Sequence, residues 1–275
     1  MTSEPEYDAV LDGWERSEFT AAGLTHATYR RGTGPGVIVI HEVPNITPLV
    51  TKFANEVVDR GFTVVMPSLF GTPGKPPSNA SAAAAILRGC VAKEFTALAL
   101  NRTAPVVSWL RALARNLHQD VGGPGVGAVG MCFTGGFALG MMVDEIMLAP
   151  VLSQPSTPLP FGTARAADIN LSPDDVAAVV ERAAQGCQVM GLRYPVDFSV
   201  GDRFSTLRDL LGDAGIAVGV PSATDRDRAG GAERRDDAGV ERVLEVVAVG
   251  VGAWASAGSG GAGGRGWGVG VGGGG

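Results

Sequence analysis

The sequence predicts an α/β fold, with a mostly parallel central sheet and helices on both of its faces. Short apolar runs alternate along the chain with amphipathic helical patterns, as a parallel sheet requires. Glycine and proline follow many of these runs, which is typical of the ends of strands and helices. A chain of 275 residues is long enough to form one such domain around a core of useful size.

The predicted strands are short apolar runs bounded by turn residues. They are Gly36–His41, Phe62–Met66 stopped by Pro67, a strand starting at Val126, Ile146–Val151, Cys187–Tyr194 and Ile216–Val220. The predicted helices are Pro48–Arg60, Pro105 to about His118, Pro173–Gln185 with Ser172 as N-cap, and Arg203–Leu211. The loop Gly71–Pro77 follows a strand and is rich in Gly and Pro, so we expect it to line a site.

The composition changes at about residue 219. From there to Gly275 the chain has no Phe, Tyr, Ile, Met, Lys, His, Asn, Gln or Cys, and it ends almost entirely in glycine. Such a segment buries too little apolar surface to offset the entropy of ordering it. We therefore expect a domain at 1–218 and a low-complexity, disordered tail at 219–275. The restricted residue set is also typical of G+C-rich codons read in the wrong frame, so a frameshift is a second hypothesis.

Charge and composition exclude several classes of partner. The net charge of −6 and the pI near 5.1 argue against nucleic-acid binding, which favours a small-molecule substrate. No apolar run is long enough to span a bilayer, and the acidic start lacks a signal-peptide pattern. Three widely spaced cysteines favour neither disulfides nor a metal site. We expect a cytoplasmic monomer without a metal.

The segment Val126–Gly140 carries the clearest chemical signal. It reads as an apolar strand that turns through small residues into a helix, with Cys132 at the apex. This is the nucleophile-elbow pattern of the α/β-hydrolase fold, in which the turn lifts the nucleophile clear of the sheet. An isolated cysteine is more often a small buried hydrophobe, but the apex position favours a nucleophile here.

Three segments resemble the dienelactone hydrolase family, whose members are cysteine α/β-hydrolases that open lactones and related enol esters. The segments are His41-Glu42-Val43, Gly130-Met131-Cys132-Phe133-Thr134-Gly135-Gly136 and Gly191-Leu192-Arg193-Tyr194-Pro195-Val196-Asp197. The resemblance covers roughly residues 15 to 218.

The resemblance implies a role for each matching residue. Cys132 would be the nucleophile, and Glu42 would contact its thiol in the resting enzyme. Asp197 would orient a catalytic histidine, and the backbone N–H groups of Val43 and Phe133 would form the oxyanion hole. The reaction implied is hydrolysis of a small-molecule carboxylic ester or lactone, without a cofactor.

Two features depart from the family pattern. Thr134 stands where a glycine is usual, although a small residue still suits the turn. More seriously, the family's histidine follows the last core strand, whereas the only histidines here are His26, His41 and His118, all before the elbow. A free thiol has a pKa around 8.5 and needs a nearby base or cation to ionise at neutral pH. The alternative function is therefore a catalytically impaired or non-catalytic protein of the same fold.

Other interpretations of the site residues stay open from the sequence. Glu42 is also suited to cap the helix that follows. Asp202 precedes a predicted helix and competes with Asp197, although loops beyond strand ends are where α/β sites gather. His41 ends a strand at the correct edge, either as a structural neighbour of the site or as a substitute base. Cys90 and Cys187 are expected to be structural.

Overall fold

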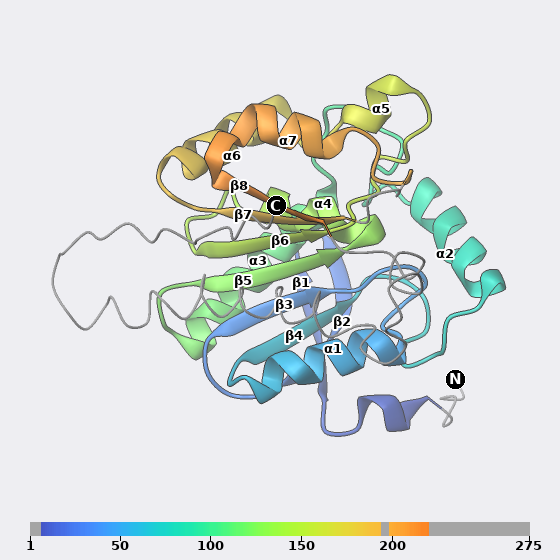
Figure 1. Ribbon diagram of the computed structural model, residues 1–275. Helices are drawn as coiled ribbons and strands as arrows, with labels where there is room; N and C mark the ends of the chain where they lie inside the picture. Colours follow the sequence, from blue (N-terminus) through green and yellow to red (C-terminus); the bar gives the residue numbers. More distant parts are fainter. Residues whose placement is uncertain (1–6, 194–197, 220–275) are drawn as a thin grey trace, which may run out of the picture.

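The computed structural model describes residues 7–193 and 198–219 and contains one sheet of eight strands (Figure 1). The strands lie in the order β1-β2-β4-β3-β5-β6-β7-β8. Their bounds are β1 Glu15–Ala21, β2 Leu24–Arg31, β3 Gly36–Ile40, β4 Thr63–Ser68, β5 Val126–Met131, β6 Met147–Ser153, β7 Val189–Arg193 and β8 Gly215–Gly219. β3 to β8 are parallel, and β1 and β2 add an antiparallel edge. The predicted mostly parallel sheet is confirmed.

Helices cover both faces of the sheet, as predicted. They are α1 Pro48–Asp59, α2 Asn79–Val91, α3 Pro105–Val121, α4 Gly135–Met141, α5 Thr163–Ala167, α6 Pro173–Ala184 and α7 Arg203–Leu211. Alternate residues of β3 separate two cores: Val37 and Val39 pack with α1, whereas Ile38 and Ile40 pack with α3, α4, α6 and α7. This alternation is the two-residue period of a strand buried on both faces. Among the described residues, no helix is both long enough and apolar enough to cross a membrane.

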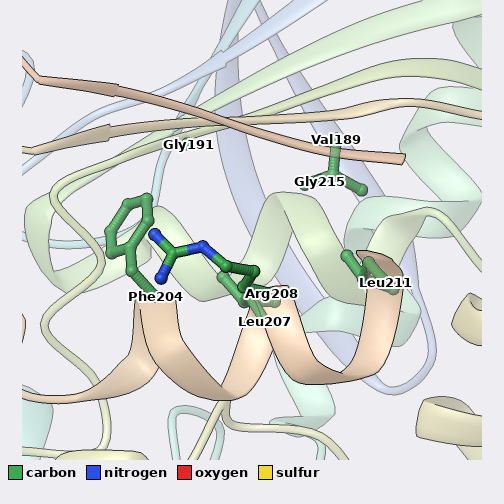
Figure 2. A pocket seen from close by; sticks show the side chains of 7 residues that line it. All are labelled: Val189, Gly191, Phe204, Leu207, Arg208, Leu211 and Gly215. Atoms are coloured by element: carbon green, nitrogen blue, oxygen red, sulfur yellow. The ribbon is translucent and has the colours of Figure 1, made fainter. Parts of the chain in front are cut away.

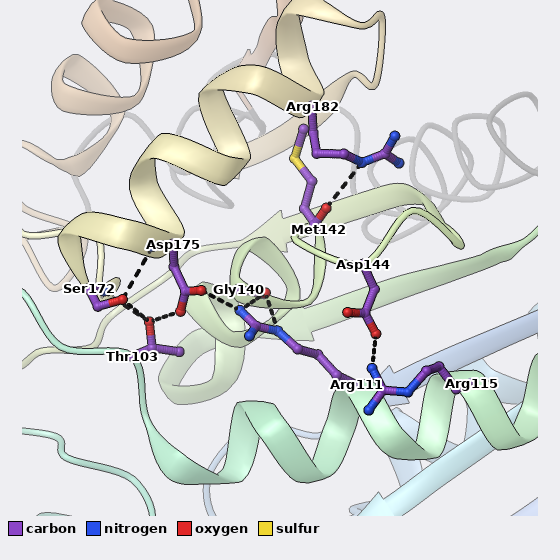
Figure 3. A network of polar contacts seen from close by, with 9 residues as sticks. All are labelled: Thr103, Arg111, Arg115, Gly140, Met142, Asp144, Ser172, Asp175 and Arg182. Carbon is purple, nitrogen blue, oxygen red and sulfur yellow. Dashed lines mark hydrogen bonds and ion pairs between the residues drawn. The ribbon is translucent and has the colours of Figure 1, made fainter.

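The helix α4, which follows the elbow, is fastened at its C-terminal end by arginines from two neighbouring helices (Figure 3). Arg111 of α3 donates from Nε and Nη2 to the Gly140 carbonyl, at 2.9 and 2.6 Å, and also pairs with Asp175 of α6 at 3.1 Å. Arg182 of α6 donates to the Met142 carbonyl at 3.4 Å. The last carbonyls of a helix have no partners within it and carry partial negative charge. The arginines therefore satisfy these carbonyls and hold α4 in place.

The N-terminal hairpin was not predicted from the sequence. β1 is an edge strand whose residues are mostly exposed, so it lacks the apolar alternation that marks a half-buried strand. Its two-residue turn consists of Ala22 and Gly23, with φ of 49° and 77°. Both values are positive, as a type I′ hairpin turn requires. Alanine is an uncommon choice there, so the usual Asn-Gly signal is missing.

Several predicted boundaries are wrong by a few residues. Pro67 does not stop β4, which continues to Ser68. The pairing of β4 with β3 ends at Val65. Pro67 therefore does not have to donate an N–H to β3, and a proline is tolerated there. β7 begins at Val189 rather than at Cys187, and α2 was not predicted. The Ser172 N-cap is confirmed, because its hydroxyl accepts from the Asp175 N–H at 3.3 Å.

Candidate active site

The elbow forms where β5 passes directly into helix. Cys132 follows Met131 with φ of +50° and begins a short 3-10 helix, Cys132–Thr134, which leads into α4. A non-glycine residue with this φ is uncommon and strained. The turn closes tightly because Gly130 has no side chain, since a Cβ there would lie 2.5 Å from the Thr134 carbonyl oxygen. The strand, turn and helix predicted around Cys132 are therefore present.

The Thr134 hydroxyl joins the elbow to the neighbouring strand β3. Its Oγ1 accepts from the Met131 N–H at 3.0 Å. Oγ1 also lies 3.1 Å from the carbonyl oxygens of Ile40 and His41 and 3.0 Å from the carbonyl oxygen of Met131. These three carbonyl oxygens share the one hydroxyl proton. Thr134 is fully buried. Thr134, which stands where the family pattern has a glycine, therefore adds hydrogen bonds that a glycine cannot make.

Glu42 and Cys132 occupy matching positions at adjacent strand ends. Ile40 of β3 pairs with Gly130 of β5 in parallel register, and the two site residues each come two positions later. Adjacent strands lie about 4.8 Å apart, so this register favours contact between the two side chains. Glu42 is half-buried, and burial raises the pKa of its carboxyl. The alternative role of Glu42 as a helix cap is wrong, because Thr47 caps α1.

Both ring nitrogens of His41 are engaged by the backbone. Nε2 accepts from the Leu69 N–H at 3.0 Å, so the ring proton is on Nδ1, which donates to the Glu42 carbonyl at 2.8 Å. His41 is fully buried, and burial lowers the pKa of its imidazole to about 4. It is therefore the structural neighbour that the sequence allowed for, and it is not available as a substitute base.

The other two histidines also have structural surroundings. The His26 ring packs edge-on against Trp109, and its Nε2 lies 3.6 Å from a carboxyl oxygen of Glu94. The His118 Nε2 lies 2.9 Å from the Gly123 carbonyl oxygen. That position precedes the start of β5, whereas Cys132 follows the end of the same strand, so His118 lies at the opposite edge of the sheet.

The segment after β6 packs against the elbow, and no pattern in the sequence predicted this contact. The Ser156 N–H donates to the Cys132 carbonyl at 2.9 Å, and the Ser156 hydroxyl lies 3.5 Å from the Cys132 Sγ. The Thr157 hydroxyl donates to the Phe133 carbonyl at 2.8 Å. An edge-to-face cluster of Phe70, Phe95 and Phe133 was also not predicted.

The remaining predicted residues are either in structural positions or outside the described residues. Asp197 and the tail from residue 220 lie outside the described residues. Asp202 occupies the N-cap position of α7, although its side chain makes no capping hydrogen bond. Burial raises the thiol pKa of both Cys90 and Cys187. Within 7–193 and 198–219, no three His, Cys, Asp or Glu side chains are grouped as metal ligands would be.

Two pockets differ in their relation to the elbow. One lies between α7 and the strands β7 and β8, where Phe204 packs over Gly191, and it contains none of the predicted site residues (Figure 2). The other is lined by Pro44 and Asn45, by Gly71, Thr72 and Lys75 of the loop after β4, and by residues of α2. The loop predicted to line a site therefore faces the residues that directly follow Glu42 and Val43.

Comparison with known proteins identifies relatives of this chain. Residues 23–155 match the model of the Dienelactone hydrolase family. No curated protein sequence matches the chain.

Solved structures share its fold at low sequence identity. A dienelactone hydrolase from Anabaena variabilis has a TM-score of 0.57 at 13% identity, over 88% of this chain and 98% of that one. A thermostable esterase from Pseudomonas putida has a TM-score of 0.54 at 12% identity, over 88% of this chain and 84% of that one. A dienelactone hydrolase-like promiscuous phosphotriesterase from metagenomic libraries has a TM-score of 0.54 at 16% identity, over 85% and 98%.

Removing the Thr134 hydroxyl should loosen the elbow. In the variant Thr134→Val the Met131 N–H loses its partner inside the protein, so we expect the free energy of unfolding to fall by roughly 1–3 kcal/mol. Urea denaturation measures this change. Thr134→Ser keeps the hydroxyl and should lose clearly less. Equal stability of Thr134→Val and the wild type would contradict the role given to the hydroxyl.

His41 should stay neutral at mildly acidic pH. Its folded-state pKa of about 4 lies below the ordinary value of 6.5, so only the unfolded chain takes up this proton between those pH values. His41 therefore contributes a loss of stability as the pH falls from 6.5 towards 4, with a slope of at most about 1.4 kcal/mol per pH unit. Nitrogen NMR at about pH 5.5 should find a neutral ring protonated on Nδ1. An imidazolium signal would refute this assignment.

Proposed function

We propose that the chain, whose residues 23–155 match the model of the Dienelactone hydrolase family, is a member of that family and a carboxylic ester or lactone hydrolase with the Cys132 thiolate as its nucleophile. The observation that carries the proposal is the left-handed backbone of Cys132 between β5 and α4. A strained strand-to-helix turn is the arrangement that exposes a nucleophile at the edge of an α/β-hydrolase sheet. The esterase and dienelactone hydrolase among the structural neighbours support an ester or lactone as the substrate class.

The proposed first step is acylation of the thiolate. The Cys132 sulfur attacks the substrate carbonyl carbon, a C–S bond forms, and the carbonyl electron pair moves onto oxygen. The N–H groups of Val43 and Phe133 hold this oxyanion. When the C=O bond re-forms, the bond to the alcohol oxygen breaks, and in a lactone the ring opens. The leaving oxygen takes up a proton from solvent water, and the acyl group stays on sulfur.

The second step needs a base that activates water for attack on the thioester. In the family this role belongs to a histidine oriented by the residue that corresponds to Asp197. The sequence has no histidine after His118, and both nitrogens of His41 are bonded to the backbone. The thiol lacks this base too, but roughly a few per cent of a free cysteine is thiolate at pH 7, and that thiolate is intrinsically very nucleophilic. We therefore propose that acylation, although slowed, still outpaces deacylation and that turnover is slow.

A second candidate is a protein of the same fold that does not turn over esters. The absence of a histidine after the elbow favours it. The two candidates differ in whether Cys132 reacts with an ester at all.

Hydrolysis of p-nitrophenyl acetate tests the proposal. Loss of a general base commonly costs about 10²–10⁴-fold in rate, so we expect turnover lower by that factor than in a family member with its histidine. The residual activity should disappear in Cys132→Ala and persist in Cys90→Ala. Turnover equal to that of an intact relative would refute the proposed lack of a base, and activity retained by Cys132→Ala would refute the nucleophile.

Glu42 should restrain the ionisation of the Cys132 thiol. A nearby carboxylate repels a thiolate and keeps the thiol protonated. The variant Glu42→Gln should therefore lower the apparent thiol pKa, measured as the pH dependence of alkylation by iodoacetamide and mapped to Cys132 by mass spectrometry. Glu181→Gln, an exposed change on α6, is the matched control. An unchanged pH profile for Glu42→Gln would remove Glu42 from the site.

A further inference from the structure

Ser156 contacts the elbow through both its backbone and its side chain. It lies in the segment that follows β6 and is buried, with 4% of its surface exposed. Its N–H donates to the Cys132 carbonyl at 2.9 Å. Its Oγ lies 3.5 Å from the Cys132 Sγ, within hydrogen-bond range for sulfur. One residue thus contacts the sulfur and the carbonyl of the same cysteine.

The hydroxyl is suited to donate to a thiolate. A buried hydroxyl needs an acceptor for its proton. The Cys132 Sγ lies within hydrogen-bond range of the Ser156 Oγ and can accept this proton. A thiolate accepts hydrogen bonds and cannot donate them, so once the sulfur ionises the Ser156 proton points to it. Hydrogen bonds to charged groups are stronger than neutral ones, so this contact favours the ionised sulfur.

The backbone bond acts on the proposed oxyanion hole. The Cys132 carbonyl and the Phe133 N–H belong to one planar peptide unit and point in opposite directions. A donor on the carbonyl therefore fixes the direction of the N–H and polarises it. The Thr157 hydroxyl holds the next carbonyl, that of Phe133, at 2.8 Å, and the Asn170 amide donates to that hydroxyl at 3.2 Å.

Arg203 holds the segment around Ser156 by hydrogen bonds to its backbone carbonyls. It is a buried residue at the start of α7, with 1% of its surface exposed. Its guanidinium donates to the Pro155 carbonyl at 3.4 Å and to the Pro158 carbonyl. Its Nε also donates to the Asp168 carbonyl at 2.8 Å. The segment on both sides of Ser156 is therefore attached to the helical layer, which fixes the hydroxyl relative to the sulfur.

We propose that Ser156 is a further catalytic residue, whose hydroxyl donates to the Cys132 thiolate while its N–H aligns the Phe133 N–H toward the oxyanion. This inference rests on the proposed function, because it takes Cys132 as the nucleophile. Among the described residues, the charged or titratable groups around this segment include Glu42 and His41 on the β3 side and Arg203 and Asp168 on the helical side. All four stay unchanged in the variants below.

The test is the pH profile of Cys132 alkylation by iodoacetamide in the full chain. Ser156→Ala keeps the backbone bond and removes the hydroxyl, so the apparent thiol pKa should rise by roughly one unit, with alkylation about tenfold slower below the pKa. Ser156→Thr keeps a hydroxyl and should retain most of the wild-type profile. Ser205→Ala, an exposed change on α7, is the matched control. Ser156→Gly also lacks the hydroxyl and replaces Ser156→Ala if that variant does not fold.

The outcomes separate the two proposals. A wild-type profile in the folded hydroxyl-less variant overturns the role of Ser156 while leaving Cys132 as nucleophile. Wild-type protein in which Cys90 or Cys187 is labelled ahead of Cys132 overturns the proposed function itself. A fall of melting temperature in Ser156→Ala with an unshifted profile assigns Ser156 a packing role only and also overturns the inference.

Discussion

The left-handed backbone of Cys132 is the constraint on which the candidate site depends. A residue held in this conformation costs about 1–3 kcal/mol, which surrounding contacts must offset. Two hydrogen bonds offset this cost: the Thr134 hydroxyl donates toward β3, and the Ser156 N–H donates to the Cys132 carbonyl. In addition, Gly130 has no side chain, so the turn can close without a clash. Behind them, arginines from α3 and α6 hold the end of α4. These contacts stabilise the left-handed conformation of Cys132, and this conformation places the sulfur at the carboxyl edge of the sheet.

The same edge holds ionisable groups whose chemistry is set by burial. Glu42 has a raised carboxyl pKa, and His41 has a lowered imidazole pKa, so burial favours the neutral form of both. The Nε2 of His41 joins the end of β3 to the segment after β4, and its Nδ1 donates to the Glu42 carbonyl. This structural use removes the imidazole from proton transfer. The candidate site therefore combines a well-supported position for a nucleophile with no histidine base among the described residues. Acylation uses the thiolate itself, whereas hydrolysis of the thioester needs a base to activate water, so the missing base should slow the second step more than the first.

The sequence predicted the strands, turns and caps that have a local signal, such as a periodic pattern of buried residues or a turn made of small residues. The parallel strands β3 to β8, the strand-turn-helix around Cys132 and the cap at Ser172 all carry such local signals. The β1-β2 hairpin does not, because its exposed edge strand and Ala22-Gly23 turn lack them. Ser156 was not predicted either, since its position beside Cys132 arises from the pairing of β5 with β6, which brings together residues 24 positions apart. Asp197 falls outside the described residues, and its role stays a prediction.

Mass spectrometry of the protein after brief exposure to p-nitrophenyl acetate tests the central claim most directly. If Cys132 is a nucleophile without an efficient base for the second step, one acetyl group per chain should accumulate on the peptide that contains Cys132, together with a burst of p-nitrophenol, and should be released slowly. Acetylation of another residue, or no acetyl group on Cys132 despite release of p-nitrophenol above the uncatalysed rate, would contradict the account.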